Sequence, residues 1–254
     1  MTEVKLCDVQ IWTASPQNFQ AAQCSDLSLL LDKTECLLSE QFNVEADRHA
    51  YVLAHALRRL ALARALAVAP SSIVFSREAN GKPVLVGPPE RAIFFGHSHT
   101  RAAVVCAVTR IGPIGIDAEV SQDRIADFEL LESFVALPDA QRREEEVGAD
   151  PARQFYFYWT ALEAFWKATG TGLSSENPRI RCQKNRFGLF EISLEVDGPV
   201  KPVARVIPVQ SPAGCSITLA LSYPTAHQCS FPTIRHVQGE AELNQLFNKH
   251  LQQK

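Results

Sequence analysis

The chain has 254 residues, of which 46% are hydrophobic, and is long enough to bury a substantial core as one large or two closely joined domains. Its formal net charge of −3 gives no electrostatic reason to expect nucleic acid or an anionic membrane as a partner. Apolar runs are all much shorter than a membrane span, and the N-terminus lacks a basic segment followed by an apolar one, so we expect a cytoplasmic protein.

The first half of the chain predicts a strand, a long helix and three further strands. The helix is expected over Glu45 to Val68, because its leucines and alanines combine helical propensity with an apolar face. Strands are expected where short apolar runs lie between turn residues. These runs are Val4 to Thr13, Ile73 to Ser76, Ala92 to Phe95 and Ala102 to Thr109.

The second half predicts a strand at Ile114 to Val120, which follows a turn at Arg110 to Pro113. Two helices are then expected, at Asp123 to Ala136 and at Pro151 to Thr169. Further strands are expected near Leu189 to Val196, Val203 to Val209 and Ser216 to Ser222, and an amphipathic surface helix at Glu240 to Lys254. Helices followed by antiparallel strands therefore recur in both halves.

Two acidic residues stand in the apolar strand that opens the second half. Because side chains alternate along a strand, Asp117 and Glu119 project to the same side and Ala118 to the other. Carboxylates in such apolar surroundings are costly to bury unless a cation compensates them. A Mg²⁺ ion carrying a substrate phosphate would provide that compensation.

The helix at Pro151 to Thr169 carries a third acidic residue next to a lysine. Glu163 and Lys167 are four residues apart and lie one turn from each other beside an apolar stripe. The stripe consists of Phe155, Trp159, Leu162 and Trp166. Taken alone, the pair is better explained as an ordinary exposed ion pair than as part of a functional site.

Two further stretches carry groups that can contact phosphate. In Asn-Gly-Lys-Pro, Pro83 holds Lys82 in an extended conformation that can direct its ammonium group toward a bound anion. In Phe-Phe-Gly-His-Ser-His-Thr, His97 and Ser98 follow an apolar run and can donate hydrogen bonds to phosphate oxygens. Each stretch by itself is equally compatible with a turn or a polar loop.

In chain order, Asn-Gly-Lys-Pro, Phe-Phe-Gly-His-Ser, Gly-Ile-Asp-Ala-Glu and Trp-Thr-Ala-Leu-Glu-Ala-Phe-Trp-Lys resemble the motifs of the larger, surfactin-synthetase-activating (Sfp-type) class of 4′-phosphopantetheinyl transferases. The resemblance runs from about Asp47 to Leu173. It implies an α+β fold of two similar α/β halves related by pseudo-twofold symmetry, with the active-site cleft between them. Residues 1–112 would form the nucleotide side of the site, and residues 113–254 would carry the metal and the catalytic helix.

The resemblance also implies a reaction. The 4′-phosphopantetheine group of coenzyme A would pass to a serine of an acyl or peptidyl carrier protein, and adenosine 3′,5′-bisphosphate would be released. The enzyme would be a Mg²⁺-dependent monomer, with Mn²⁺ as a possible substitute. Asp117, Glu119 and Glu163 would hold the metal, Lys167 would neutralise phosphate charge, and Glu163 would act as the base for the serine.

The same resemblance assigns the nucleotide-side contacts. His97 would donate a hydrogen bond to phosphate with Ser98 beside it, Lys82 and Pro83 would line the nucleotide end, and Arg48 would contact the ribose 3′-phosphate. Two positions depart from the family pattern: Leu162 stands where a lysine is usual, and Gly96 where a serine is usual.

Two other functions fit parts of the pattern. A metal-dependent hydrolase would use His97 and His99, which share one face of a strand, with Asp117 or Glu119 completing a transition-metal site. A non-catalytic descendant would bind coenzyme A or a carrier protein without transfer, as the changes at Leu162 and Gly96 suggest.

Arginines and cysteines complete the expectations. An acidic carrier protein needs a local basic patch, for which the candidates are Arg58, Arg59, Arg64, Arg142 and Arg143. The seven cysteines are odd in number and include no Cys-x-x-Cys pair, which favours reduced thiols over a disulfide framework or a zinc cluster.

Overall fold

The computed structural model describes residues 8–78, 81–87, 93–121, 127–196, 201–211, 214–222 and 233–238, together with positions 243 and 245. The chain divides into two compact units. The first unit comprises Met1–Ile111 and Cys229–Lys254, and the second comprises Gly112–Gln228. In the part of the chain that the structure describes, no helix has the length and apolar character needed to cross a membrane.

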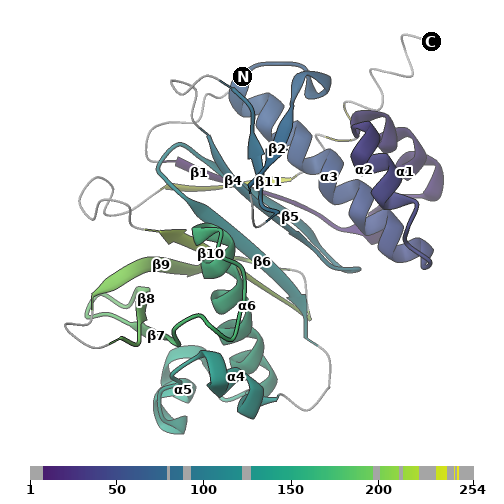
Figure 1. The fold of residues 1–254 in the computed structure, drawn as a ribbon. Coiled ribbons are helices and arrows are strands. Elements are labelled where there is room, and N and C mark those ends of the chain that lie inside the picture. Colours follow the sequence, from purple (N-terminus) through teal and green to yellow (C-terminus); the bar gives the residue numbers. More distant parts are fainter. Residues whose placement is uncertain are drawn as a thin grey trace. The chain divides into compact units, whose positions relative to one another are not determined.

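The first unit is built on a four-stranded sheet with the order β11-β1-β5-β4 (Figure 1). The strands are β1 (Asp8–Ala14), β4 (Phe94–His99), β5 (Val104–Thr109) and β11 (Thr233–Gln238). β1 and β4 both pair antiparallel with β5, whereas β11 pairs parallel with β1. Because β11 pairs with β1, the C-terminal part of the chain belongs to the first unit. The two units therefore do not correspond to residues 1–112 and 113–254.

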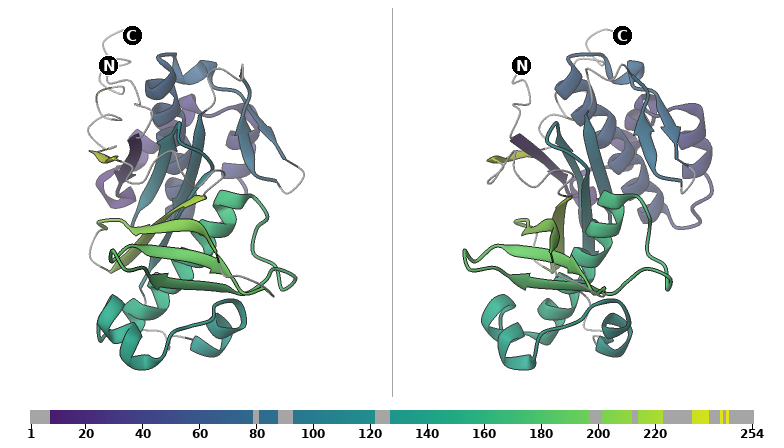
Figure 2. Two further views of the ribbon diagram at one scale, coloured as in Figure 1. Left: turned by 90° about the vertical axis from the view of Figure 1, so that its left-hand side faces the viewer. Right: turned by 60° about the vertical axis from the view of Figure 1, so that its left-hand side comes forward.

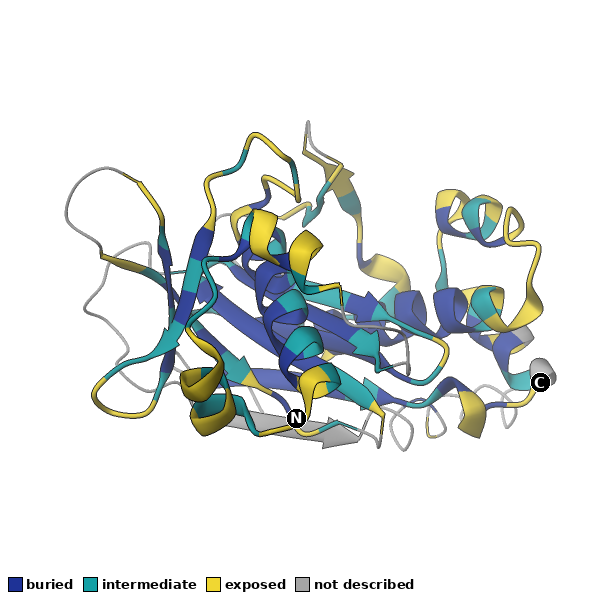
Figure 3. Cartoon of the chain, turned by 90° about the horizontal axis from the view of Figure 1, so that it is seen from below, coloured by how far each residue is buried: buried dark blue, intermediate teal, exposed yellow. Residues whose placement is uncertain are grey.

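A long helix, α3 (Glu45–Leu66), supplies most of the first unit's core. Glu45 and Asp47 lie in its first turn and Arg64 in its last turn. Acidic side chains at the N-terminus and basic side chains at the C-terminus interact favourably with the helix dipole. The helix ends at Ala67, whose φ of 58° is left-handed. Its leucines and alanines pack with apolar side chains of β1, β4 and β5 in one buried cluster. Figure 3 colours the chain by burial, with buried residues in dark blue.

Smaller elements complete the first unit. They are α1 (Ala21–Leu27), α2 (Lys33–Ser39), the hairpin of β2 (Phe75–Arg77) and β3 (Pro83–Leu85), and three 3-10 helices at Pro16–Asn18, Ser28–Leu30 and Pro70–Ser72. Asp32 caps α2 by accepting a hydrogen bond from the Glu35 amide, and the Glu35 side chain accepts one from the Asp32 amide in return.

The second unit contains an antiparallel five-stranded sheet with the order β6-β10-β9-β8-β7. The strands are β6 (Ile114–Val120), β7 (Ile180–Lys184), β8 (Phe190–Leu194), β9 (Pro202–Pro208) and β10 (Cys215–Ser222). The long helix α6 (Pro151–Thr169) packs against β6 and β10 (Figure 2). The helices α4 (Phe128–Phe134) and α5 (Ala140–Val147) pack against α6.

Several predicted elements are confirmed. The α+β class is correct, and β6 and α6 have the predicted bounds. The strand predicted at Ile73 to Ser76 is shifted, because Ile73 follows a 3-10 helix and pairing starts at Phe75. α1, α2, α5, β3, β7 and β11 were not predicted. The helix predicted at Glu240 to Lys254 lies almost entirely outside the described residues, as do residues 4–7 of the first predicted strand and 123–126 of the predicted Asp123 helix.

Candidate metal and phosphate site

The candidate site of the second unit depends on unusually close packing between β6 and α6. A Cβ atom placed on Gly115 would lie 2.0 Å from the carbonyl oxygen of Ala164 and 2.5 Å from the amide nitrogen of Ala168. Only glycine therefore allows the strand to approach the helix backbone this closely. The contact sets the distance between the acidic strand, two residues further on, and the acidic face of the helix.

The three predicted metal ligands meet at this contact. Asp117 and Glu119 lie on the same face of β6, and Glu163 faces them from α6. One carboxylate oxygen of each lies within 4.8 Å of the others. Asp117 is almost fully buried, at 1% exposure, whereas Glu119 and Glu163 are half-buried. Residues 44 positions apart in the chain thus form one cluster of oxygen donors.

Among the described residues, Lys167 contributes positive charge to the cluster. The Nζ atom of Lys167 donates a hydrogen bond to Asp117 Oδ1 and lies 3.8 Å from Glu163 Oε2. Burial, and then the charges of Asp117 and Glu119, raise the pKa of Glu163 to about 7, although Lys167 opposes the shift. Burial and the charge of Asp117 also raise the pKa of Glu119. One ammonium group therefore does not balance three carboxylates.

This donor set fits a divalent cation. Mg²⁺ and Mn²⁺ prefer carboxylate oxygens, and a bound divalent cation would offset the burial and the repulsion that raise the two glutamate pKa values. In the described part of the chain, Asp117, Glu119 and Glu163 form the one group of three or more acidic, histidine or cysteine side chains that could share an ion. His97 and His99, the alternative ligands of a hydrolase, belong to the first unit, whereas the acidic cluster belongs to the second.

Threonine and serine side chains support the cluster from the neighbouring strand. Thr160, one turn before Glu163 on α6, has its Oγ1 atom 2.7 Å from Thr218 Oγ1 and 3.3 Å from Ser216 Oγ. Thr218 and Ser216 on β10 are paired in register with Asp117 and Glu119. Sequence reasoning missed this row of hydroxyls, because nothing in the sequence indicates which strand lies beside β6.

The departure at Leu162 has a structural explanation. Leu162 is fully buried in the second unit's core, between Ala161 and Glu163 on α6. The next residue, Glu163, lies on the helix face that meets β6. The side chain at position 162 therefore contributes to the hydrophobic core. Trp166 of the predicted stripe is likewise buried, whereas Phe155 and Trp159 are only partly buried.

The first unit holds the predicted phosphate-contacting histidine next to a buried arginine. His97 lies on β4, and its Nε2 atom is 3.4 Å from Nη1 of Arg58 on α3. The rings of His97 and His55 are in edge contact, with their centroids 5.3 Å apart. Burial, followed by the charge of Arg58, lowers the pKa of His55 well below its usual range. Ser98 is buried, and strand alternation places it on the opposite face of β4 from His97.

The remaining predicted contacts also belong to the first unit. Lys82 directly precedes β3, which begins at Pro83. Burial lowers the pKa of the Lys82 ammonium group. Asn80 of the same motif lies outside the described residues. Arg48, in the first turns of α3, lines a cavity of about 490 Å³ together with Glu45 and His49.

Two of the arginines predicted to form a carrier-binding patch are structural, and that prediction is wrong for them. Arg58 and Arg59 are buried and both pair with Glu35, Arg59 through Nε at 2.7 Å. Arg59 also pairs with Asp32 at 2.6 Å, and the Arg58 guanidinium lies 4.3 Å from the centre of the Phe75 ring. The amphipathic pattern of α3 does not reveal that a carboxylate from α2 reaches these side chains.

Arg64 and Arg142 are exposed, and Arg143 is half-buried. Arg142 pairs with Glu146 one turn further along α5, at 2.9 Å. Arg143 donates a hydrogen bond to the Pro138 carbonyl oxygen at 2.7 Å. Each of the described cysteines, Cys24, Cys36, Cys106, Cys182 and Cys215, is a free thiol, as predicted.

Comparison with known proteins links both units to one family. The model of the 4′-phosphopantetheinyl transferase superfamily matches residues 113–207, and a model described as 4′-phosphopantetheinyl transferase, N-terminal, matches residues 10–110. The first match contains the whole acidic cluster and Lys167, and the second contains His97, Lys82 and Arg48.

Individual relatives agree with the family models. The 4′-phosphopantetheinyl transferase HetI of Nostoc sp. is 31% identical over 172 residues, which cover 66% of this chain and 70% of HetI. A putative 4′-phosphopantetheinyl transferase of Synechocystis sp. is 30% identical over 57% of this chain and 59% of its own length, less than two thirds. The 4′-phosphopantetheinyl transferase Sfp of Bacillus subtilis is 29% identical over 61% of this chain and 66% of Sfp. The chain therefore belongs to the 4′-phosphopantetheinyl transferase superfamily.

Proposed function

We propose that the protein transfers the 4′-phosphopantetheine group of coenzyme A to a serine of an acyl or peptidyl carrier protein. The observation that carries this proposal is the cluster of Asp117, Glu119 and Glu163 facing one lysine. These residues lie in the segment that matches the superfamily model, and the relatives named above are described as 4′-phosphopantetheinyl transferases.

In this proposal the three carboxylates hold Mg²⁺, which when bound would neutralise the charge of the coenzyme A pyrophosphate. Mn²⁺ would satisfy the same oxygen donors. Lys167, already directed at Asp117, stays beside the reacting phosphate and supplies a fixed positive charge. His97, with Lys82, Pro83 and Arg48, contributes the nucleotide-side contacts.

Glu163 is the proposed base for the carrier serine. Burial and the neighbouring carboxylates raise its pKa to about 7 without metal, and a bound cation would lower that pKa, so Glu163 would be ionised at neutral pH and able to accept a proton. The serine oxygen attacks the β-phosphorus of coenzyme A, the bond from that phosphorus to the bridging oxygen breaks, and adenosine 3′,5′-bisphosphate leaves. The serine proton passes to Glu163.

A single incubation tests the proposal. The protein is mixed with coenzyme A, Mg²⁺ and a panel of apo carrier proteins from fatty acid, polyketide and nonribosomal peptide synthesis, and the carriers are examined by intact mass. At least one carrier should gain the mass of phosphopantetheine, and chelating the metal should prevent the gain. Measurable coenzyme A binding without modification of any carrier would instead support the non-catalytic descendant.

A further inference from the structure

The lysine of the acidic cluster contacts two of the carboxylates that could hold a cation. Nζ of Lys167 donates a hydrogen bond to Asp117 Oδ1 and lies 3.8 Å from Glu163 Oε2. The same two side chains each contribute an oxygen to the group of three that lie within 4.8 Å of one another. The ammonium group of Lys167 and a bound divalent cation would therefore compete for the same two carboxylates.

The two partners of the Lys167 contact differ in how far they can move. The side chain of Asp117, on β6, is 2% exposed, whereas the side chain of Lys167 is 38% exposed. The first carbon of the lysine side chain is held by packing, because a Cβ atom placed on Gly115 would lie 3.0 Å from the Cβ atom of Lys167. The rest of the lysine is a flexible stem, so the ammonium group can change its position while Asp117 stays in place.

Electrostatics disfavours an ammonium group and a divalent cation on one buried carboxylate. Like charges repel each other more strongly near a buried group than in water, because the effective dielectric constant is lower there. Since Asp117 is buried and Lys167 is not, the lysine is the side chain that gives way. A phosphate next to the cation would then offer the displaced ammonium group a new acceptor.

We propose that Lys167 takes the place of the cation at Asp117 and Glu163 until a divalent cation binds, and that it then turns to the phosphate that accompanies the cation. The inference rests on the proposed function, in which Lys167 lies beside the reacting phosphate, and it adds where the ammonium group lies beforehand. Lys167 weakens the binding of the cation alone and contacts coenzyme A only once the cation is bound. It thereby couples the binding of the two.

Lys167→Met removes the competing charge and keeps an unbranched side chain. Mn²⁺ binding without coenzyme A, followed by electron paramagnetic resonance, should become about tenfold tighter in this variant, because the cation no longer displaces an ammonium group. Unchanged or weaker Mn²⁺ binding would overturn the proposal.

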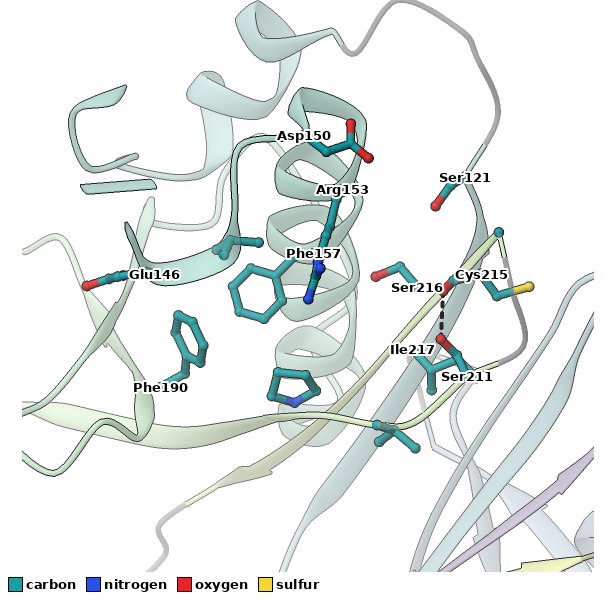
Figure 4. A pocket seen from close by; sticks show the side chains of 14 residues that line it. Ser121, Glu146, Asp150, Arg153, Phe157, Phe190, Ser211, Cys215, Ser216 and Ile217 are labelled. Atoms are coloured by element: carbon teal, nitrogen blue, oxygen red, sulfur yellow. Dashed lines mark hydrogen bonds between the residues drawn. The ribbon is translucent and has the colours of Figure 1, made fainter. Parts of the chain in front are cut away.

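Arg153→Met is the matched control, because it removes a positive charge from the same helix. Figure 4 shows Arg153 at a cavity of about 450 Å³, whose described lining residues do not include the three carboxylates. Arg153 is exposed and lies about 15 Å along α6 from Glu163, so its charge is largely screened and its loss should change Mn²⁺ affinity by less than about twofold.

Coenzyme A binding tests the coupling. Calorimetry without a carrier gives the dissociation constant of coenzyme A with chelator and with saturating Mg²⁺, and the ratio of the two constants measures the coupling. This ratio should be about tenfold larger in the parent than in Lys167→Met, because the ammonium group contacts the phosphate only after the cation has displaced it. A lysine that remained on Asp117 would act on coenzyme A equally under both conditions, so equal ratios would overturn the proposal.

A measurement on the parent protein does not depend on the folding of a variant. In acetylation by acetic anhydride, the amine attacks the anhydride carbonyl, an amide forms, and acetate and a proton leave. Peptide mapping gives the rate at Lys167 and, as an internal control, at Lys184, whose Nζ donates a hydrogen bond to the Glu146 carbonyl oxygen.

Mg²⁺ should raise the acetylation rate of Lys167 by about fivefold or more over the rate with chelator, because it shifts the lysine away from Asp117. Coenzyme A added with Mg²⁺ should lower the rate again, and the rate at Lys184 should stay constant. A rate at Lys167 that does not respond to Mg²⁺ would overturn the proposal.

The parent protein also shows which proposal has failed. If it binds Mn²⁺ and coenzyme A and modifies a carrier while the Lys167 measurements contradict the proposal, only the displacement of Lys167 is wrong. If it binds neither ligand and modifies no carrier, the proposed function fails and the displacement fails with it.

Discussion

Each unit of the protein buries charged side chains next to a long helix, but only one of the two clusters is balanced. In the first unit, Glu35 and Asp32 meet the guanidinium groups of Arg58 and Arg59, so two acidic groups face two basic ones. In the described part of the second unit, the ion pairs found for the three carboxylates of the cluster are those with Lys167. The balanced cluster needs nothing further, whereas the acidic one is suited to a cation that arrives from solution.

The difference in charge balance indicates a structural role for the cluster of the first unit and a functional role for the cluster of the second. A buried ion pair whose partners satisfy each other is costly to break and has little capacity for a ligand. Burial and then the neighbouring carboxylates raise the pKa values of Glu119 and Glu163, and a bound divalent cation would stabilise their ionised forms. The four predictions below test that distinction, starting with the one that should produce the largest effect.

Glu163→Gln should lower the rate of carrier modification by about 10² to 10⁴-fold, because the amide can neither accept the serine proton nor contribute charge to the metal site. The measurement is the initial rate by intact mass at saturating coenzyme A and Mg²⁺. Glu132→Gln, at an exposed position on α4 outside the cluster, is the matched control and should retain the parent rate. Parent-like turnover by Glu163→Gln would remove the base assignment.

Glu35→Gln should destabilise the protein by about 3–5 kcal/mol, since the two buried guanidinium groups lose their shared carboxylate. Denaturant unfolding monitored by circular dichroism gives the change. The control is Asp47→Asn, which removes an exposed ion pair with Arg101 and should leave the transition midpoint nearly unchanged. Equal small effects of both substitutions would show that the buried cluster is not structural.

The difference between the clusters also explains how much the sequence could predict. β6 and α6 were predictable because both follow simple periods, and their motifs place Asp117, Glu119 and Glu163 on definable faces. Glu163 comes close to the strand because Gly115 allows the backbones of β6 and α6 to approach each other. A glycine inside an apolar strand often indicates such a close backbone approach. The sequence contained this signal, and we assigned it no role.

The balanced cluster gave no comparable signal. Glu35 is one acidic residue among several in a short polar stretch, and its partners lie 23 and 24 residues away on a helix whose arginines resemble a solvated face. The pairing of β11 with β1 depends on contacts between the two ends of the chain, which local periodicity cannot reveal. The same limit left the position of β10 beside β6, and thus Thr218 and Ser216, unpredicted.

In the absence of metal, Glu163→Gln should stabilise the protein by about 1–3 kcal/mol at pH 8, because it removes a carboxylate whose ionised form is disfavoured by burial and by the charges of Asp117 and Glu119. The folded-state pKa of Glu163 is about 7, above its ordinary value of 4.5, so the folded state binds a proton between these two values while the unfolded state does not. The parent should therefore gain relative stability as the pH falls through 7, and the advantage of the variant should disappear near pH 5.

Unfolding midpoints of parent and variant at pH 8 and pH 5, with chelator or with Mg²⁺, measure this effect. Mg²⁺ should stabilise the parent at pH 8 and have a smaller effect on the variant. The exposed control Glu132→Gln should show no pH-dependent difference from the parent. A variant less stable than the parent at pH 8 without metal would show that the cluster is already balanced, contrary to the comparison of the two units.

The smallest expected effect concerns His97, where the balanced cluster contacts a predicted binding residue. A guanidinium group can only donate, so the hydrogen bond from Arg58 requires His97 Nε2 to be the acceptor and places the ring proton on Nδ1. Arg58→Lys keeps the positive charge near Glu35 but shortens the reach toward the imidazole. We expect a mixture of His97 tautomers and coenzyme A binding weakened by about 2–10-fold.

Nitrogen-15 NMR of the His97 ring distinguishes the tautomers directly. Arg59→Lys is the control, because Arg59 is equally buried and pairs with the same Glu35 but makes no hydrogen bond with His97 among the contacts described here for the two side chains. It should leave the Nδ1–H form dominant. If both lysine variants gave the parent spectrum, Arg58 would have only the structural role of its neighbour, and the balanced cluster would be separate from ligand binding.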